Sequence, residues 1–340
     1  MILVKKAMVM AAGVGSRLDP LTQTVPKPLV PILNKPVMDI LLEKLSKYGV
    51  KSVIANTYYL AKNIQNRYEK DSPVDINFES ICEETLSGTA GGVKKCEFFF
   101  KDEENFLVVS ADGLHDADLG KIIESHKASG CIATMAIAEI VREEVSKYGV
   151  VVYSNDNKVV EFQEKPSLIE AKSNFINTGI YVFNKRIFDF IPENTVYDFA
   201  KNVFPLLLSI GEKINVCKIN DYWSDIGTIE QYIQSNWDAL DGSVEANNNK
   251  IVTTSKGKYV VGENCIIPQN LDIEGFVVIG HNCEIGENVH LKNAILWDNV
   301  VVKDSVSITN SVVANDSIIF SSIAGQIVPA KTQNESIIVR

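Results

Sequence analysis

A short segment near the N-terminus combines the residue types that bind a chain of phosphates. An apolar run, residues 7–12, ends in Gly13-Val14-Gly15-Ser16-Arg17, and Lys27 follows. The two glycines allow a tight turn that brings backbone N–H groups close to a ligand. Arg17 and Lys27 add two positive charges beside that turn. Because peptide donors, Arg and Lys together can hold phosphate oxygens, this segment is predicted to bind a nucleoside triphosphate.

Three other interpretations of this segment fit its sequence less well. A dinucleotide-binding fingerprint needs a third glycine and a helix that opens at the loop. Leu18-Asp19 stand at that point instead, and prolines at 20, 26, 28, 31 and 36 exclude one long helix. A Walker loop needs Gly-Lys followed by Ser or Thr, which is missing here. An ordinary turn with a solvated arginine leaves Pro20-Leu21-Thr22 and Pro26-Lys27-Pro28 unexplained.

The composition is that of a globular protein long enough for two domains. The chain has 340 residues, of which 46% are hydrophobic and 22% charged, and its net charge is −10. This negative charge argues against binding to duplex nucleic acid. The six cysteines form no Cys-x-x-Cys pair, which favours free thiols in a reducing cytosol. Lys5-Lys6 interrupt the apolar N-terminus, so no signal peptide is expected, and no apolar run reaches the length of a membrane span.

Hydrophobic periodicity places the phosphate loop in an α/β fold. It predicts helices over residues 37–48, 61–69, 119–129, 203–210 and 229–240, and strands over 50–55, 74–78, 106–109 and 132–138. This alternation favours a mostly parallel sheet with helices on both faces, and such sheets bind ligands at the carboxyl ends of their strands. Asp112 follows the apolar strand 106–109 and so stands at that edge. A carboxylate there commonly holds a divalent cation.

A second domain with a different hydrophobic pattern follows residues 241–250. This segment contains Gly242 and the run Asn247-Asn248-Asn249. Aliphatic or aromatic residues then recur every sixth position, at Val261, Ile267, Ile273, Ile279, Ile285, Leu291 and Trp297. Six residues per short strand and turn is the hexapeptide pattern of a β-helix, in which each coil buries a column of aliphatic side chains. His281 and His290 lie in this region and are expected at turns or faces.

The motifs of the phosphate-binding segment resemble the signature of a known enzyme family. Gly13-Val14-Gly15-Ser16-Arg17, Pro20-Leu21-Thr22 and Pro26-Lys27-Pro28 are similar to those of the sugar-1-phosphate nucleotidylyltransferases, also called NDP-sugar pyrophosphorylases. The resemblance implies a Rossmann-like nucleotidyltransferase domain and, for the tail, a left-handed β-helix. It also implies nucleotide contacts and two catalytic cations. The nucleotide contacts are Ala12, Gly13, Gly15 and Ser16, and the catalytic cations are Arg17 and Lys27.

The same resemblance implies a base-binding stretch over residues 83–92. Leu86-Ser87-Gly88-Thr89-Ala90-Gly91 is similar to the family's Leu-Gly-Thr-Ala-Gly motif, which makes Gly88 and Thr89 expected nucleotide contacts. Glu83 precedes Gly88 by five residues, where the family places a side chain that reads the base edge. A carboxylate offers acceptors only, which suits the two adjacent donors of guanine. Glu83 therefore favours GTP, although the neighbouring Glu84 leaves the register open.

Later motifs resemble the family's sugar-phosphate site. They are Tyr148-Gly149-Val150-Val151-Val152, Glu161-Phe162-Gln163-Glu164-Lys165-Pro166 and Asn177-Thr178-Gly179-Ile180-Tyr181. The resemblance assigns Gly149, Glu164 and Asn177 to the sugar and Lys165 to its phosphate. Asp225, in Trp223-Ser224-Asp225-Ile226-Gly227, resembles the family's second metal aspartate, so Asp112 and Asp225 are expected to be catalytic and to bind Mg²⁺. Ala111 stands where the family usually has glycine before the first aspartate.

The implied reaction is nucleotidyl transfer from a nucleoside triphosphate to a sugar 1-phosphate, with release of pyrophosphate. GTP with mannose 1-phosphate is the expected pair, and glucose 1-phosphate with UTP or dTTP is the alternative. A regulatory subunit without catalysis is a second alternative, although Arg17, Lys27, Asp112 and Asp225 are all present. Acyl transfer is a third, because hexapeptide β-helices often host it, with His281 and His290 as candidates by residue type only.

The expected organisation is a nucleotidyltransferase domain over residues 1–242 and a β-helix domain over residues 250–340. We expect the β-helix to serve oligomerisation or regulation, and the protein to form a homo-oligomer through it. The expected partners are the two substrates, with no nucleic acid and no membrane, and the expected location is the cytoplasm.

Overall fold

The computed structural model describes residues 4–70, 72–246, 250–330 and the backbone of 338–339. The chain divides into two compact units, one made of residues 1–14 and 41–225 and the other of residues 15–40 and 226–340. The segment that begins at Gly15, the second glycine of the phosphate loop, thus belongs with the C-terminal part of the chain. Asn247–Asn249, expected to mark a domain boundary, lie outside the described residues.

The first unit is built on one sheet, with nine strands among the described residues. One half is the parallel set β6 (Asn105–Ser110), β1 (Lys6–Ala11), β4 (Ser52–Thr57) and β5 (Asn77–Cys82), in that spatial order, with β5 at the edge. Because the four strands run the same way, their carboxyl ends lie at one edge. The loops that carry Gly13, Glu83 and Asp112 all follow these strands.

The other half of the sheet is organised around the long strand β11 (Phe175–Asn184). It is antiparallel to β6 on one side, and on the other to β8 (Ala133–Glu139) and β9 (Gly149–Tyr153). Strand β10 (Val159–Glu164) continues from β9, and β12 (Ile214–Lys218) pairs in parallel with β8. The expected mostly parallel α/β sheet is therefore confirmed, with an antiparallel extension that the periodicity did not indicate.

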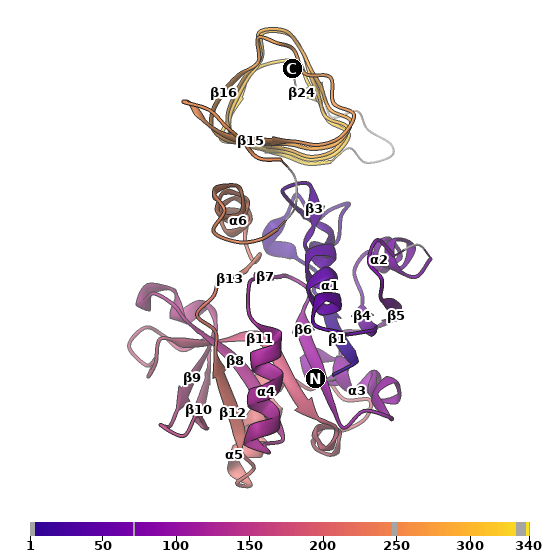
Figure 1. Ribbon diagram of the computed structural model, residues 1–340, viewed down its shortest axis with the longest axis vertical. Coiled ribbons are helices and arrows are strands. Elements are labelled where there is room, and N and C mark those ends of the chain that lie inside the picture. The colour runs from indigo at the N-terminus through magenta and orange to yellow at the C-terminus, as the bar shows by residue number, and fades with distance from the viewer. Residues whose placement is uncertain (1–3, 71, 247–249, 331–337, 340) are drawn as a thin grey trace. The chain divides into compact units, whose positions relative to one another are not determined.

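Alternating side chains place cores on both faces of this sheet. On one face Met8, Val108 and Tyr181 are buried in a core that also includes side chains of α3 and α5. On the other face α4 packs on β8, where Nδ1 of His126 lies 2.9 Å from the hydroxyl of Thr134. The α-helices among the described residues are α1 (Val37–Lys47), α2 (Ala61–Tyr68), α3 (Gly88–Lys95), α4 (Leu119–Ser129), α5 (Phe204–Ser209) and α6 (Ile229–Asp241) (Figure 1).

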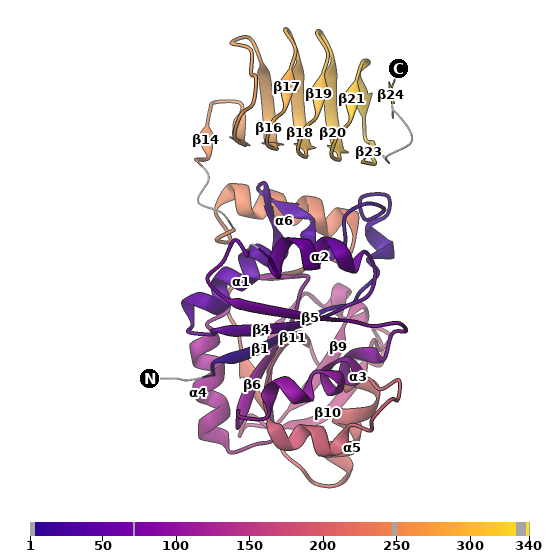
Figure 2. The same cartoon turned by 90° about the vertical axis from the view of Figure 1, so that its right-hand side faces the viewer.

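The second unit contains the β-helix that the hexapeptide pattern predicts. One face is formed by parallel strands, which are β15 (Gly257–Val261), β16 (Asp272–Ile279), β18 (His290–Leu296), β20 (Ser307–Val313), β22 (Ile323–Ala324) and β23 (Ile327–Val328). Another face is formed by β17 (Glu284–Ile285), β19 (Val301–Val302), β21 (Ile318–Ile319) and β24 (Ile338–Val339). The short strand β14 (Val252–Thr253) pairs with β15. The coils are triangular end-on in Figure 1 and stacked side-on in Figure 2.

Asparagine side chains stabilise the turns between coils. Asn264, Asn282 and Asn299 adopt positive φ, which asparagine tolerates better than most residues, and their amides hydrogen-bond from coil to coil. Helix α6 joins the same unit through Tyr232, whose hydroxyl accepts a 2.7 Å hydrogen bond from the indole of Trp297. The hairpin of β2 (Pro31–Ile32) and β3 (Lys35–Pro36) also packs on α6.

Candidate active site

The phosphate loop follows β1 directly, and its two glycines have different structural roles. A Cβ added at Gly13 would meet no described heavy atom within 4 Å, so the fold itself does not require glycine there. Gly15 has φ +74°, and a Cβ there would lie 3.0 Å from Cβ of Lys27. Gly15 thus permits the positive-φ backbone conformation at this turn, whereas Gly13 leaves open space where a ligand could approach the chain. Ala12, between β1 and Gly13, is buried.

The segment after Gly15 forms two 3₁₀ turns in the second unit, not one long helix, as its prolines predict. The turns are Ser16–Leu18 and Lys27–Leu29, and the Thr22 hydroxyl donates to the Gly15 carbonyl at 3.0 Å. Arg17 is exposed, whereas Lys27 is buried. The structure therefore gives the two predicted catalytic cations different environments within this unit.

The two predicted metal aspartates are brought together on a two-stranded ribbon in the first unit. Strand β7 (Gly113–His115) pairs antiparallel with β13 (Trp223–Asp225), and Asp225 stands opposite Gly113, next to Asp112. The Tyr148 hydroxyl donates to Oδ1 of Asp225 at 2.7 Å. Two aspartates at neighbouring backbone positions, one of them oriented by a phenol, fit a hard divalent cation such as Mg²⁺. No group of three or more His, Cys, Asp or Glu side chains suited to a metal occurs in the described part of the chain.

The same ribbon is tied to the predicted sugar-phosphate motifs. The indole of Trp223 donates to the Thr178 carbonyl at 3.1 Å, and its ring packs edge-on against Tyr148 at 5.5 Å. Gly179 has φ +76°, and a Cβ there would lie 2.5 Å from the Ser110 hydroxyl, so only glycine fits between β11 and the end of β6. This close approach also brings the Asn177 motif near the strand that leads to Asp112.

Gly149 and Glu164 face each other in the β9–β10 register, and a Cβ at Gly149 would lie 3.2 Å from a Glu164 carboxylate oxygen. The Lys165 N–H donates to the Tyr148 carbonyl at 3.1 Å. Desolvation raises the pKa of Glu164, Lys165 opposes that rise, and Asp198 adds to it. Three of the four predicted sugar-phosphate residues are therefore adjacent.

Asn177, the fourth predicted sugar-phosphate residue, has a side chain that is hydrogen-bonded within its own strand, β11. Its amide donates to the Tyr181 hydroxyl at 2.6 Å, and its carbonyl oxygen accepts from the Gly179 N–H at 3.1 Å. These contacts fix the orientation of the Asn177 amide. Its contact with a sugar hydroxyl stays a prediction.

The predicted base loop opens helix α3 and is clamped by a distant segment. Gly88 has φ +76°, and a Cβ there would lie 2.4 Å from the Tyr197 carbonyl. That carbonyl also accepts hydrogen bonds from the N–H groups of Ala90 and Gly91, each at 3.0 Å. The Thr89 hydroxyl donates to Asp198 at 2.9 Å, so its expected nucleotide contact would need the backbone or a change of partner.

Glu83 lies deeper than a residue expected to read a base edge. Only 1% of its side chain is exposed. Oε1 accepts from the Asn56 amide at 2.7 Å, and Oε2 accepts from the Lys95 ammonium at 2.9 Å and from the N–H and hydroxyl of Ser87. The carboxylate therefore anchors the base loop, and direct base reading through it stays a prediction.

Sequence reasoning missed the partners of the predicted residues. Asn56 is a buried polar residue near the carboxyl end of the apolar strand β4, a signal that could have identified it. Tyr197 and Asp198 follow no recognisable local pattern, and Asp198 reaches Thr89 across 109 positions of sequence. Asp198 also influences Glu164, so it links the predicted base loop to the predicted sugar site.

Comparison with known families identifies both parts of the chain. Residues 6–242 match the nucleotidyl transferase family, and residues 255–332 match the GMPPB C-terminal domain. The chain belongs to the nucleotidyl transferase family, and it is a sugar-1-phosphate nucleotidyltransferase. Within the described residues, no helix combines the length and apolar character needed to cross a membrane.

Similar proteins differ in the nucleotide and sugar that their names state. A UTP–glucose-1-phosphate uridylyltransferase of Synechocystis is 37% identical over 81% of this chain and 74% of its own length. A mannose-1-phosphate guanyltransferase of Yarrowia lipolytica is 33% identical over 77% of this chain and 71% of its own. The crystal structure of HddC from Yersinia pseudotuberculosis superposes with a TM-score of 0.59 at 27% identity, covering 68% of this chain and 97% of HddC.

Proposed function

We propose that the protein transfers the guanylyl group of GTP to mannose 1-phosphate, giving GDP-mannose and pyrophosphate. Three observations support this choice. The β-helix region matches a GMPPB C-terminal domain, and the Yarrowia lipolytica relative carries a guanyltransferase name. Glu83 stands before the base loop with hydrogen bonds that favour its ionised form. An ionised carboxylate accepts hydrogen bonds only, so it suits a base edge that carries donors, such as the N1–H and exocyclic amine of guanine.

In this proposal an oxygen of the sugar phosphate attacks the α-phosphorus of GTP, and the bond from that phosphorus to the bridging oxygen of pyrophosphate breaks. The nucleophile is already an anion, so catalysis consists of positioning and charge neutralisation. Asp112 and Asp225 would hold Mg²⁺, which would offset charge on phosphate oxygens. The juxtaposition of these two aspartates on one ribbon, beside the sugar-phosphate motifs, is the observation that carries the proposal.

The remaining site residues have the roles that their sequence motifs suggest. Residues 12–16 hold the triphosphate with Arg17, and Lys27 neutralises charge at the α-phosphate. Lys165 holds the phosphate of the sugar, while Gly149, Glu164 and Asn177 contact its ring. Gly88 and Thr89 support the base.

The domain ranges 1–242 and 250–340 also belong to the proposal. In it the β-helix joins copies of this chain into a homo-oligomer. All six cysteines are free thiols, which suits a reducing cytoplasm.

Uridylyl or thymidylyl transfer to glucose 1-phosphate is the second candidate. It is favoured by the Synechocystis relative, whose name states UTP and glucose 1-phosphate and whose identity is 37%. The mechanism and the metal aspartates would be the same, and only the reading of the base and sugar would differ.

Pyrophosphate release with Mg²⁺ tests both candidates. The assay crosses GTP, UTP, dTTP, CTP and ATP with mannose 1-phosphate and glucose 1-phosphate. Turnover with GTP and mannose 1-phosphate above all other pairs is the expected result. Preference for UTP or dTTP with glucose 1-phosphate would replace the first candidate by the second.

The metal assignment has its own test. Asp112→Asn keeps the size of the side chain but removes the charge, and it is expected to lower turnover by orders of magnitude with little change in melting temperature. Near-normal turnover in this variant would remove Asp112 from the mechanism.

A further inference from the structure

Four side chains of the first unit form one hydrogen-bonded network behind the base loop. Asn56 lies at its centre, because its carbonyl oxygen accepts from the Ala11 N–H at 3.2 Å while its amide nitrogen donates to Glu83 at 2.7 Å. Lys95 and Ser87 complete the network at the other carboxylate oxygen. The end of strand β1, which leads into the phosphate loop, is thus joined through two side chains to the start of helix α3.

This network determines how Glu83 could meet a base. Among the described residues, Oε1 accepts only from Asn56, whereas Oε2 accepts from both Lys95 and Ser87. Because a carboxylate oxygen can accept two hydrogen bonds, Oε1 keeps one acceptor direction. The bond from Asn56 fixes that oxygen in place, and Lys95 holds the opposite oxygen.

A close packing contact supports the same geometry. A Cβ at Gly92 of α3 would lie 2.5 Å from Nδ2 of Asn56 and 3.2 Å from Oε1 of Glu83. Any larger residue would displace Asn56. The helix therefore approaches strand β4 closely enough for the Asn56–Glu83 bond only because residue 92 has no side chain.

The network also controls the charge of Glu83. Burial alone would raise the pKa of Glu83, but hydrogen bonds from Ser87, Lys95 and Asn56 and the charge of Lys95 bring it below its ordinary value. Lys95, at the end of α3, is the ionisable group that acts on Glu83, and the charge of Glu83 in turn adds to the effect of burial in raising the pKa of the Cys96 thiol. Without Lys95 the carboxylate would be buried with fewer compensating contacts.

We propose that Asn56 and Lys95 are positioning residues that aim Oε1 of Glu83 at the base and thereby set the preference for guanine. This inference rests on the proposed GTP-dependent function and deepens it. Neither residue touches substrate. Each acts through Glu83, and the motifs that suggested the nucleotide site include neither.

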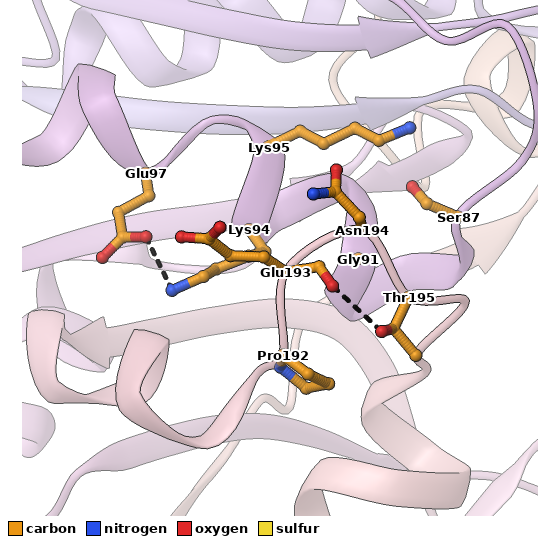
Figure 3. Close-up of a pocket in the computed structure, with 9 residues that line it drawn as sticks. All are labelled: Ser87, Gly91, Lys94, Lys95, Glu97, Pro192, Glu193, Asn194 and Thr195. Carbon is orange, nitrogen blue, oxygen red and sulfur yellow. Dashed lines mark hydrogen bonds and ion pairs between the residues drawn. The ribbon is translucent and has the colours of Figure 1, made fainter.

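Lys95 can be tested selectively because its neighbour Lys94 offers a matched control. Both leave the same turn of α3 and line one pocket of about 180 Å³, which residues 192–195 close on the other side (Figure 3). Lys94 pairs instead with Glu97 at 2.7 Å and with the Phe188 carbonyl at 3.0 Å. Lys94→Ala therefore removes a cation from the same helix and pocket but leaves Glu83 untouched.

The measurement is the ratio of kcat/KM for GTP to kcat/KM for UTP, both with mannose 1-phosphate. The ratio is independent of how much of a variant is folded, so partial unfolding does not mimic a loss of selectivity. Lys95→Ala is expected to lower it at least tenfold and Lys94→Ala to leave it unchanged. Asn56→Asp, which keeps the acceptor for Ala11 but replaces the donor to Glu83 by a second carboxylate, is expected to lower it as well.

Three further readouts separate positioning from a merely structural role. Loss of Lys95 raises the pKa of Glu83, so the acid limb of kcat/KM for GTP should move to higher pH in Lys95→Ala. Methylammonium chloride should partly restore the GTP-to-UTP ratio of this variant, because the pocket beside Lys95 can admit a small cation. Lys95→Arg, which keeps the charge, should retain most of the selectivity.

The outcomes distinguish this inference from the proposed function. If the wild-type protein does not favour GTP over UTP, the proposed function fails. If the wild type favours GTP but Lys95→Ala and Asn56→Asp keep its ratio and its pH profile, the proposed function stands and the positioning role is overturned.

Discussion

The phenol of Tyr148 donates a 2.7 Å hydrogen bond to Oδ1 of Asp225, across 77 positions of sequence. Tyr148 precedes Gly149 of the sugar motif, and Asp225 is a proposed metal ligand, so one bond joins the two halves of the proposed chemistry. A hydrogen bond from a second residue to a metal-binding carboxylate fixes which oxygen faces the ion. The metal site and the sugar-phosphate site are therefore expected to respond together when this bond is removed.

Tyr148→Phe removes the hydroxyl and keeps the ring that packs on Trp223. Loss of such a supporting contact typically costs about 10–100-fold in metal affinity or activity. We expect the Mg²⁺ concentration for half-maximal turnover to rise within that range. Tyr153→Phe, at the far end of strand β9, which follows Tyr148, is the control and should leave the Mg²⁺ dependence unchanged. An unaltered Mg²⁺ titration in Tyr148→Phe would show that Asp225 does not depend on this bond.

Gly88→Ala should damage the base loop for two reasons. Residue 88 has positive φ, which costs about 1–2 kcal/mol for a residue with a Cβ. The new methyl group would also stand 2.4 Å from the Tyr197 carbonyl, so the clamp on α3 must shift. Gly130→Ala has positive φ but no described neighbour within 4 Å, and it isolates the first effect.

We therefore expect Gly88→Ala to lower the free energy of unfolding more than Gly130→Ala and to raise KM for the nucleotide, whereas Gly130→Ala leaves KM unchanged. Chemical denaturation and initial-rate kinetics measure the two effects. Equal nucleotide KM values in Gly88→Ala and wild type would argue that the loop does not contact the base.

The pH dependence of sugar-phosphate use should report on Glu164. Desolvation and Asp198 raise its pKa above the ordinary 4.5, with Lys165 opposing. Protonation removes the negative charge of the carboxylate that accepts hydrogen bonds from sugar hydroxyls. The value of kcat/KM for the sugar 1-phosphate should therefore fall as pH drops through this raised pKa. Asp198→Asn removes the negative neighbour, and the acid limb should then move to lower pH. Because the substrate phosphate also titrates, the test compares the acid limbs of the wild type and Asp198→Asn with the same sugar 1-phosphate. Identical acid limbs in the two proteins would exclude Glu164 as the titrating group.

Periodic patterns and glycine-rich motifs made much of this fold predictable from sequence. The hexapeptide repeat is a local rule that each coil obeys, so it predicted the β-helix. The strand expected at residues 74–78 is wrong in position, because strand β5 begins at Asn77 and a backbone hydrogen bond from Ile76 to Val74 forms a turn first. Alternation alone cannot distinguish a strand from an extended turn that precedes it.

Partners distant in sequence were beyond sequence reasoning. The burial of Glu83 depends on Asn56 and Lys95, which lie on a different strand and a helix. The assignment of residues 15–40 to the second unit follows from packing with α6, including the bond from the Leu33 N–H to Asn236. No local pattern in a single chain encodes such contacts, because any polar side chain of suitable reach could make them.

His115 makes a prediction about stability. It is 3% exposed, and neither ring nitrogen has a hydrogen-bond partner among the described residues. Burial lowers its pKa to about 3, and the nearby Lys44 adds to this effect. As pH falls below the ordinary 6.5, the unfolded chain binds a proton at this residue and the folded protein does not. The free energy of unfolding should therefore decrease by about 2 kcal/mol between pH 7 and pH 5 through His115.

His115→Leu tests this in urea unfolding at the two pH values. The variant should lose about 2 kcal/mol less than the wild type between pH 7 and pH 5, because leucine does not titrate. Leu114→Ala, at the neighbouring position of β7, should lower stability equally at both values. The pH-dependent loss that remains in His115→Leu is expected to come partly from His126, whose pKa burial lowers to about 4. If His115→Leu and wild type lose the same free energy, the folded protein must admit a proton at His115, and the ribbon that carries Asp112 and Asp225 would be more open to water than its packing indicates.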